Sequence, residues 1–343
     1  MIDFTADFIA LLRNTTNSYK YLFLKSVLAR TQQNQERISV NDIVADQLVY
    51  AWYPNQYFKL SFGLQDKISQ VFKEQNFNYS SNIPITSNDF EHQLRAEILT
   101  HVDTVALSRL SVYVQFRLIS PFFDQELRGK PDHVKNNMIA ELSNQTYDIR
   151  KPLYRIETDK QFIQVHPEWG KFIRRHYHLL AAYLESEWVK YLQKHNPNIP
   201  GVISKTAPPI NRSSLKSQTS YWTDYLIEHP RTLCIYSGDS LDNASISIDH
   251  FLPWSFVCHD RIWNLVPTTK SINSSKGNAL PSMDKYLDKF IETQFSALSY
   301  HNKKCKDWDK ISFEVMHDLG LSDTKQLLND VAFEKHISQV LVG

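Results

Sequence analysis

Apolar residues recur at helical spacing along most of the N-terminal half of the chain. Stripes with an apolar residue every three or four positions begin near Phe4, after Asn17 and at Asn41, and further stripes follow to about residue 142. This spacing predicts amphipathic helices that bury one face in a core. The segment 107–122 is strongly apolar, and its pattern fits a core helix and a pair of strands equally well.

A short hairpin and a long helix come next in the pattern. The apolar runs 154–156 and 162–165 flank a polar turn, which is typical of a β-hairpin. Helical periodicity then continues through residues 167–195, until Asn196-Pro197 interrupts it. We therefore expect a mainly α N-terminal body over residues 1–195, with a substrate-selecting or regulatory role.

Proline and asparagine accumulate after this helix. Residues 196–213, which include Pro208-Pro209, have the composition of a linker. Helical spacing returns from Ser214 to Glu228, so we predict a second domain over residues 214–343.

The pattern of this second domain changes period within a short distance. Residues 245–251 alternate as a strand does, residues 263–269 fit a second strand, and residues 271–278 begin a helix. The sequence therefore predicts a C-terminal α+β module in which two strands precede a helix.

Composition narrows the class of protein. The chain has 343 residues, of which 42% are hydrophobic, and only 8 are glycine, as expected for a globular and mainly helical protein. Three widely spaced cysteines give no disulfide framework, which fits a reducing cytoplasm. The N-terminus lacks a basic signal region, and no apolar run reaches the ~20 residues of a membrane span. We expect a cytoplasmic protein without a membrane partner.

Charge does not by itself indicate a nucleic-acid-binding protein. The formal net charge is +1, whereas strong binders of nucleic acid usually carry a basic patch. Basic residues do gather around the predicted module. Among them, Arg212, Lys270 and Lys276 are the candidates for contacts with phosphate groups.

One group of polar residues in the module carries the chemistry. Asp249-His250 ends the first predicted strand, Asn264 follows fourteen residues after the histidine, and Asn273 follows nine later, with Lys276 beyond it. A carboxylate and an amide offer hard oxygen atoms that suit Mg²⁺ or Mn²⁺. A histidine can accept a proton at neutral pH. Together they indicate a one-metal site that hydrolyses phosphodiesters.

These residues and their spacing resemble the HNH nuclease family over about residues 231–281. Within it, the intervals are most similar to the HNH domain of the CRISPR-associated RNA-guided DNA nuclease. The resemblance implies a ββα-metal fold in which Asp249 and Asn273 bind the metal and His250 is the general base. It also implies that Asn264 braces the loop and orients His250, and that Lys276 holds the phosphate near the leaving oxygen.

The resemblance also raises the question of zinc, because many family members hold this module together with a zinc ion bound by two Cys-x-x-Cys pairs. Here the first pair is reduced to Cys234, and the second, near Thr268, is missing. We therefore expect no structural zinc. The hydrophobic residues Trp254, Phe256, Trp263 and Leu265 should form the core instead.

The leading interpretation is a Mg²⁺-dependent endonuclease that nicks or cleaves double-stranded DNA. Family-level expectation adds a role in restriction or anti-phage defence, with a homodimer or partner defence proteins as possible assemblies. Two alternatives stay open. One is a catalytically silent DNA-binding protein with an HNH fold, and the other is an RNase or a nuclease subunit of a larger complex.

Overall fold

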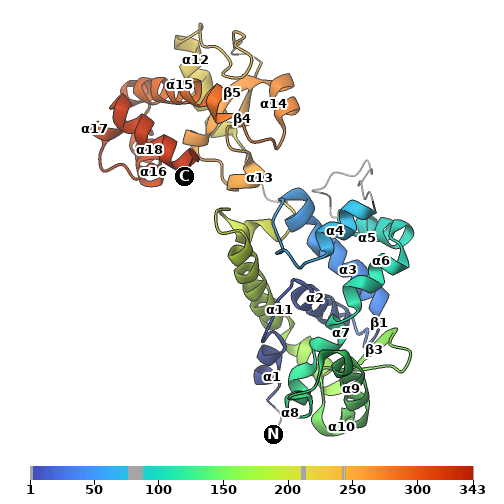
Figure 1. The fold of residues 1–343 in the computed structure, drawn as a ribbon. Helices are drawn as coiled ribbons and strands as arrows, with labels where there is room; N and C mark the ends of the chain where they lie inside the picture. Colours follow the sequence, from blue (N-terminus) through green and yellow to red (C-terminus); the bar gives the residue numbers. More distant parts are fainter. Residues whose placement is uncertain are drawn as a thin grey trace. The chain divides into compact units, whose positions relative to one another are not determined.

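The computed structural model describes residues 3–75, 87, 89–209, 214–241, 243 and 245–342, without the side chains of Thr104 and Val342. The chain divides into two compact units, Met1–Ile210 and Asn211–Gly343, which we call the first and second units. Each is mainly helical (Figure 1). No helix in these described ranges is long and apolar enough to cross a membrane.

The first unit contains eleven α-helices within its described part. They are α1 (Phe4–Leu11), α2 (Tyr19–Gln32), α3 (Val40–Trp52), α4 (Ile68–Glu74), α5 (Phe90–His101), α6 (Thr104–Ser111), α7 (Val114–Arg117), α8 (Asp124–Leu127), α9 (Asp132–Gln145), α10 (Tyr147–Arg150) and α11 (Pro167–His195). A π-helical turn over Tyr53–Tyr57 extends α3, and a 3₁₀ turn over Ser120–Phe123 precedes α8. The apolar segment 107–122 is therefore helical and contains no strand.

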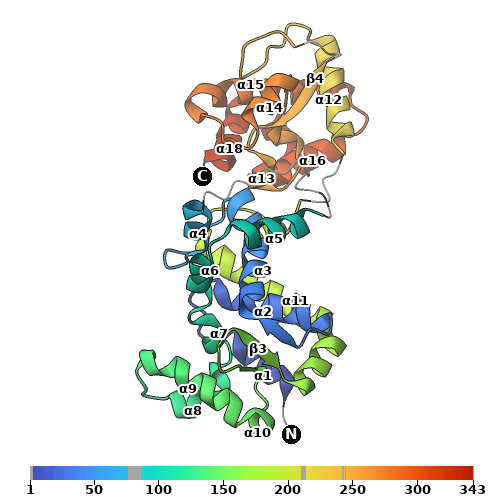
Figure 2. The ribbon, with the colours of Figure 1, turned by 90° about the vertical axis from the view of Figure 1, so that its right-hand side faces the viewer.

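The core of the first unit forms where α2 packs against α3 and against α11, and α2 lies beside both helices (Figures 1 and 2). Trp169 and Trp188, both on α11, are among its largest buried side chains. The predicted hairpin is present as β2 (Tyr154–Ile156) and β3 (Phe162–Val165). A third strand, β1 (Arg37–Ser39), pairs antiparallel with β3 on its other edge.

Residues 196–209, which the sequence placed in a linker, pack on the first unit. Asn196 is buried, and its side chain bonds to both the N–H and the carbonyl of Ser61. The 3₁₀ turn Val202–Lys205 follows, and the Lys205 side chain is fully buried with its ammonium on the Pro200 carbonyl. The boundary between the units therefore falls only at Ile210 and Asn211. The physical reason is that prolines broke the helix without removing the apolar contacts of Val202.

This packing changes where a protease should act. Trypsin is expected to cut the native protein after Arg212, at the boundary between the units, and to spare Lys205 because its side chain is buried. Intact mass measurement of the products distinguishes the two cuts. A fragment that starts at Ser213 and stays folded would support two independent domains, whereas rapid cleavage after Lys205 would contradict the packing described above.

The second unit contains a two-stranded sheet and seven α-helices within its described part. The strands β4 (Ile246–His250) and β5 (Leu265–Thr269) are antiparallel, with Asp249 opposite Val266. The helices are α12 (Lys216–Glu228), α13 (Trp254–Val257), α14 (Lys270–Lys276), α15 (Met283–Lys304), α16 (Trp308–Leu319), α17 (Thr324–Leu327) and α18 (Asp330–Val342). Helix α14 follows β5 directly and contacts both strands, so the order is strand, strand, helix.

The core of the second unit differs from the prediction. Leu265 and Trp263 are buried, but Trp254 and Phe256 are only half-buried. The core is built instead by α12, α15, α16 and α18 around the sheet, and the ring of Phe251 stacks on that of Phe290 with 4.0 Å between centroids. The apolar faces of these helices bury surface that would otherwise be exposed to water. In α13, Ser255 and Val257 are buried, whereas Trp254 and Phe256 stay partly exposed.

Cys234 and Thr268 mark the positions where the sequence analysis looked for Cys-x-x-Cys pairs. Cys234 is buried, and its Sγ lies 3.2 Å from Thr268 Oγ1. The backbone around it is closed by hydrogen bonds from Gly238 N to Cys234 O and from Cys234 N to Asp239 O. The contact between Cys234 and Thr268 thus joins this turn to β5.

Candidate active site

The candidate site begins at the last two residues of β4. Asp249 and His250 are 3% and 6% exposed, and they pair with Val266 and Leu265 of β5. Successive side chains on a strand point to opposite faces. Accordingly, Asp249 bonds to residues of α14 and of the segment before β4, whereas His250 bonds to the loop after α13.

The Asp249 carboxylate is held by a cation and a phenol. Lys276 Nζ lies 3.1 Å from Asp249 Oδ2 and 3.3 Å from Oδ1, and it also donates to the His250 carbonyl at 2.7 Å. Tyr236 Oη donates to Asp249 Oδ2 at 2.6 Å. Burial, and then the charge of Asp249, raises the pKa of Tyr236, so the phenol keeps its proton and remains a donor. A buried carboxylate needs such partners, because desolvation of an unpaired charge is costly.

Asn273 presents its oxygen, and not its nitrogen, as the available ligand atom. Thr269 is the N-cap of helix α14, and its hydroxyl accepts a hydrogen bond from Ile272 N at 3.3 Å. One turn later, Asn273 Nδ2 donates to Ser247 Oγ at 2.8 Å and to the Ile248 carbonyl at 3.2 Å. The amide is thereby fixed against β4 beside Asp249. Because the nitrogen is engaged as a donor, Oδ1 is the atom that could coordinate a cation.

His250 is held by a residue that the sequence analysis did not single out. Its Nε2 lies 2.8 Å from Asp260 Oδ1, and the Asp260 side chain is 16% exposed. A neutral imidazole that donates from Nε2 carries its lone pair on Nδ1. Asp260 therefore favours the tautomer in which Nδ1 accepts a proton. In the sequence, Asp260 is only a carboxylate ten residues after the histidine. Such a spacing is too common to indicate a catalytic role.

Asn264 connects the end of β4 to the start of β5. It is fully buried, its Oδ1 accepts from Leu252 N and its Nδ2 donates to Leu252 O, both at 2.9 Å. Its own carbonyl accepts from Phe251 N at 2.8 Å. Three hydrogen bonds from one residue thus fix the two residues that follow His250. Without them, the buried backbone groups of this turn would lose their partners.

Two candidates of the sequence analysis remain, Lys270 and Arg212. Lys270 is exposed at the first position of α14. Arg212 falls outside the described residues. Tyr236 was missed because the segment from Cys234 to Gly238 was considered only for its cysteines.

The oxygen donors fit a small divalent cation. Asp249 and Asn273 lie on adjacent elements and offer a carboxylate and an amide oxygen, the donors that Mg²⁺ takes when it keeps several waters. Within the described ranges, no group of three or more His, Cys, Asp or Glu residues could hold a metal ion. A magnesium site with two protein ligands does not require such a group.

Comparison with known proteins was made against families, curated proteins and solved structures. No curated protein and no solved structure matches the chain. The narrower resemblance to the CRISPR-associated nuclease therefore stays a prediction. One family model does match, and its segment contains all five polar residues of the motif, from Asp249 to Lys276. Residues 234–282 carry a domain of the HNH endonuclease family.

Proposed function

We propose that the protein is a Mg²⁺-dependent or Mn²⁺-dependent endonuclease that hydrolyses phosphodiester bonds of double-stranded DNA. One observation carries the proposal. The Asp249 carboxylate lies beside Lys276 and the fixed Asn273 amide, while the adjacent His250 is held through Nε2 by Asp260. A family match alone is compatible with an inert module. A hydrolytic site requires a histidine in a fixed orientation and oxygen ligands for a metal, and β4 supplies His250 and Asp249 as neighbours in sequence.

The residues divide the reaction between them. His250 Nδ1 accepts the proton of the attacking water, whose oxygen bonds to phosphorus as the bond to the leaving sugar oxygen breaks. Asp260 stabilises the imidazolium that forms. Asp249 and Asn273 would hold a divalent cation, which would supply positive charge to the phosphate oxygens. Lys276 adds a second positive charge beside the same phosphate.

The substrate class and the contacts with it are part of the proposal. Contacts with phosphate position a nucleic acid but do not read its sequence. The exposed Lys270 and the preceding Arg212 are proposed as such contacts. Double-stranded DNA and a role in restriction or anti-phage defence follow from the family resemblance. One such unit cuts one strand, so a double-strand break requires a homodimer, a partner protein or two successive encounters.

The direct test uses the purified full-length protein. Supercoiled plasmid, single-stranded DNA and RNA are each incubated with Mg²⁺, Mn²⁺ or a chelator. We expect conversion of supercoiled plasmid to open circle before linear product appears, and no conversion with the chelator. Cleavage of RNA alone would replace DNA as the substrate. A lack of cleavage with every substrate, together with retained DNA binding, would favour the silent DNA-binding protein.

Replacement of Asp260 tests its role as a positioning residue. Asp260→Asn should lower kcat by about 10- to 100-fold with little change in KM, because it disturbs the tautomer and not the contacts with substrate. Asp318→Asn is the matched control, since Asp318 is equally buried and binds Trp263 Nε1 at 2.9 Å in the same region. Equal losses of activity in the two variants would mean that Asp260 has only a structural role.

Replacement of Lys276 tests a separate point, because the Lys276 ammonium pairs with Asp249, a proposed metal ligand. Lys276→Met should tighten the apparent binding of Mg²⁺, since the cation no longer competes for Asp249, and should lower kcat by about tenfold or more. Metal titration of the cleavage rate separates the two effects. If metal affinity falls in the variant, Lys276 supports the metal site and does not compete with it.

A further inference from the structure

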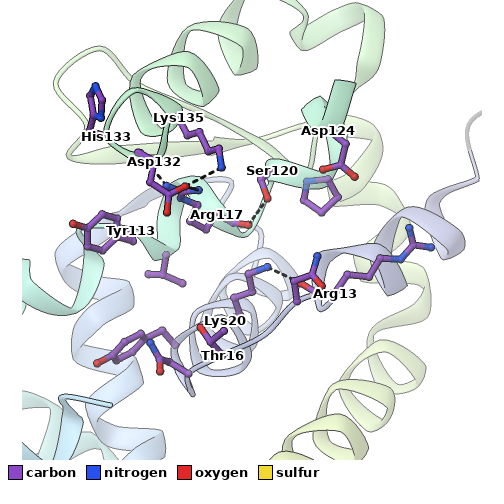
Figure 3. Close-up of a pocket in the computed structure, with 15 residues that line it drawn as sticks. Arg13, Thr16, Lys20, Tyr113, Arg117, Ser120, Asp124, Asp132, His133 and Lys135 are labelled. Carbon is purple, nitrogen blue, oxygen red and sulfur yellow. Dashed lines mark hydrogen bonds and ion pairs between the residues drawn. The ribbon is translucent and has the colours of Figure 1, made fainter. Parts of the chain in front are cut away.

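A pocket of about 890 Å³ lies within the first unit, and none of its lining residues belongs to the HNH motif. It opens between the turn that joins α1 to α2 and the segment from α7 to α9. Figure 3 shows Arg13, Thr16 and Lys20 on one wall, with Arg117, Ser120 and Lys135 on the facing wall. Pockets of this volume accommodate small molecules with several functional groups.

Positive charge predominates in the lining of the pocket. Four cationic side chains face two carboxylates, so the lining carries a net charge of +2 when its histidine is neutral; these residues are Arg13, Lys20, Arg117, Lys135, Asp124 and Asp132. The Asp132 carboxylate pairs with two of these cations: its Oδ1 lies 2.8 Å from Lys135 Nζ and 3.5 Å from Arg117 Nη1. The Asp132 side chain is 80% exposed. Exposed ion pairs of this kind contribute little stability and are easily exchanged for another anion.

Lys20 is the most informative of these residues. Its half-buried ammonium donates to the carbonyls of Leu11 at 3.3 Å and Arg13 at 3.0 Å. No carboxylate of the described residues forms an ion pair with it. Burial, and then the charge of Arg117, lowers the pKa of Lys20 to about 8, although Asp124 acts in the opposite direction. A cation placed without a counter-ion beside a second cation costs stability, and a bound anion would remove that cost.

We propose that this pocket binds a phosphorylated small molecule of nucleotide size. The cations approach from both walls, which suits a compact polyanion held between them. Tyr113, 64% exposed on the facing wall, offers an aromatic face on which a planar ring can stack. A nucleic-acid backbone would instead require a continuous basic stripe along the surface, because its phosphates are spaced along a strand. This proposal does not depend on nuclease activity. It assigns a class of ligand to the N-terminal body, for which the sequence predicted a substrate-selecting or regulatory role.

Calorimetric titration of the full-length protein provides the test. The probes are ATP, inorganic pyrophosphate and a short DNA duplex. We expect ATP to bind more tightly than pyrophosphate, and both to bind more weakly to Lys20→Met and Lys135→Ala by at least about tenfold. Lys73→Ala, which removes an exposed cation of α4 outside the pocket, is the matched control and should leave binding unchanged.

The pH dependence gives a second readout. A bound phosphate raises the pKa of Lys20, so binding at pH 8 should take up a proton and the affinity should fall as the pH rises from 7.5 to 9. The other charged or titratable groups that line the pocket are Arg13, Arg117, Asp124, Asp132, His133, Lys135 and the phenols of Tyr19 and Tyr113. The hydrogen bond from Lys135 lowers the pKa of the Asp132 carboxyl, and burial raises the pKa of Tyr19, so neither group changes charge between pH 7.5 and 9. Lys20→Arg should therefore bind ATP without this pH dependence.

Three results would overturn the proposal. One is the absence of ATP and pyrophosphate binding to the wild-type protein. Another is binding that Lys20→Met and Lys135→Ala leave unchanged. The third is binding of the duplex alone with loss in both variants, which would make the pocket part of a nucleic-acid surface.

Discussion

Replacing His250 with alanine should lower the rate of phosphodiester cleavage by about 10²–10⁴-fold, because the attacking water loses its general base. The effect should fall on kcat, since no contact with the phosphate is removed. His250 is buried against Asp260, so some loss of stability is also expected. A gel assay of plasmid nicking measures the rate, and thermal unfolding verifies that the variant is folded at the assay temperature.

The matched control for this variant is His317→Ala. His317 lies on α16 in the same unit, and its side chain is 74% exposed. Its removal should change neither cleavage nor unfolding. DNA binding, measured with the chelator present, should be nearly equal for the wild type and for His250→Ala. If folded His250→Ala cleaves at the wild-type rate, His250 is not the base and the proposed mechanism is wrong.

The sequence predicted the local elements well where periodicity and turn signals agreed. Residues 167–195 are helical with the expected ends, apart from a kink at His176, and the hairpin strands 154–156 and 162–165 are where the alternation placed them. The strand–strand–helix order of the module was also predicted. Each of these elements is specified by its own residues, through proline at a helix start or by alternating burial in a strand.

Contacts between distant residues could not be predicted in this way. Asp260 reaches His250 only because the loop after α13 folds back along β4, and Tyr236 reaches Asp249 from a segment thirteen residues earlier. Likewise, the Pro-rich stretch after His195 had the composition of a linker, but Val202 and Lys205 are buried on the first unit. Local composition does not show which partner a residue will meet, so tertiary packing decided these cases.

Changes to the two proposed metal ligands should differ in severity. Asp249→Asn should reduce cleavage by about 10³-fold, because it removes a negative charge as well as a ligand oxygen and thereby weakens the cation site by several kcal/mol. Asn273→Ala removes one neutral oxygen and should cost less. Asparagine is preferable to alanine at position 249, since it keeps a partner for Tyr236 and Lys276, which are hydrogen-bonded to the buried carboxylate.

Asn273→Asp is the informative companion to these variants. Its carboxylate adds charge where the amide Oδ1 stands, so it should retain cleavage and respond more strongly to Mn²⁺, although it loses the Nδ2 hydrogen bonds to Ser247 and Ile248. Cleavage rates titrated with Mg²⁺ and Mn²⁺ give the apparent metal affinity of each variant. Lys276 pairs with Asp249 in the absence of a metal. The alternative is that Asp249 binds no metal and only holds this lysine in place. In that case Asp249→Asn and Lys276→Met would lose activity equally, and cleavage would continue in the chelator.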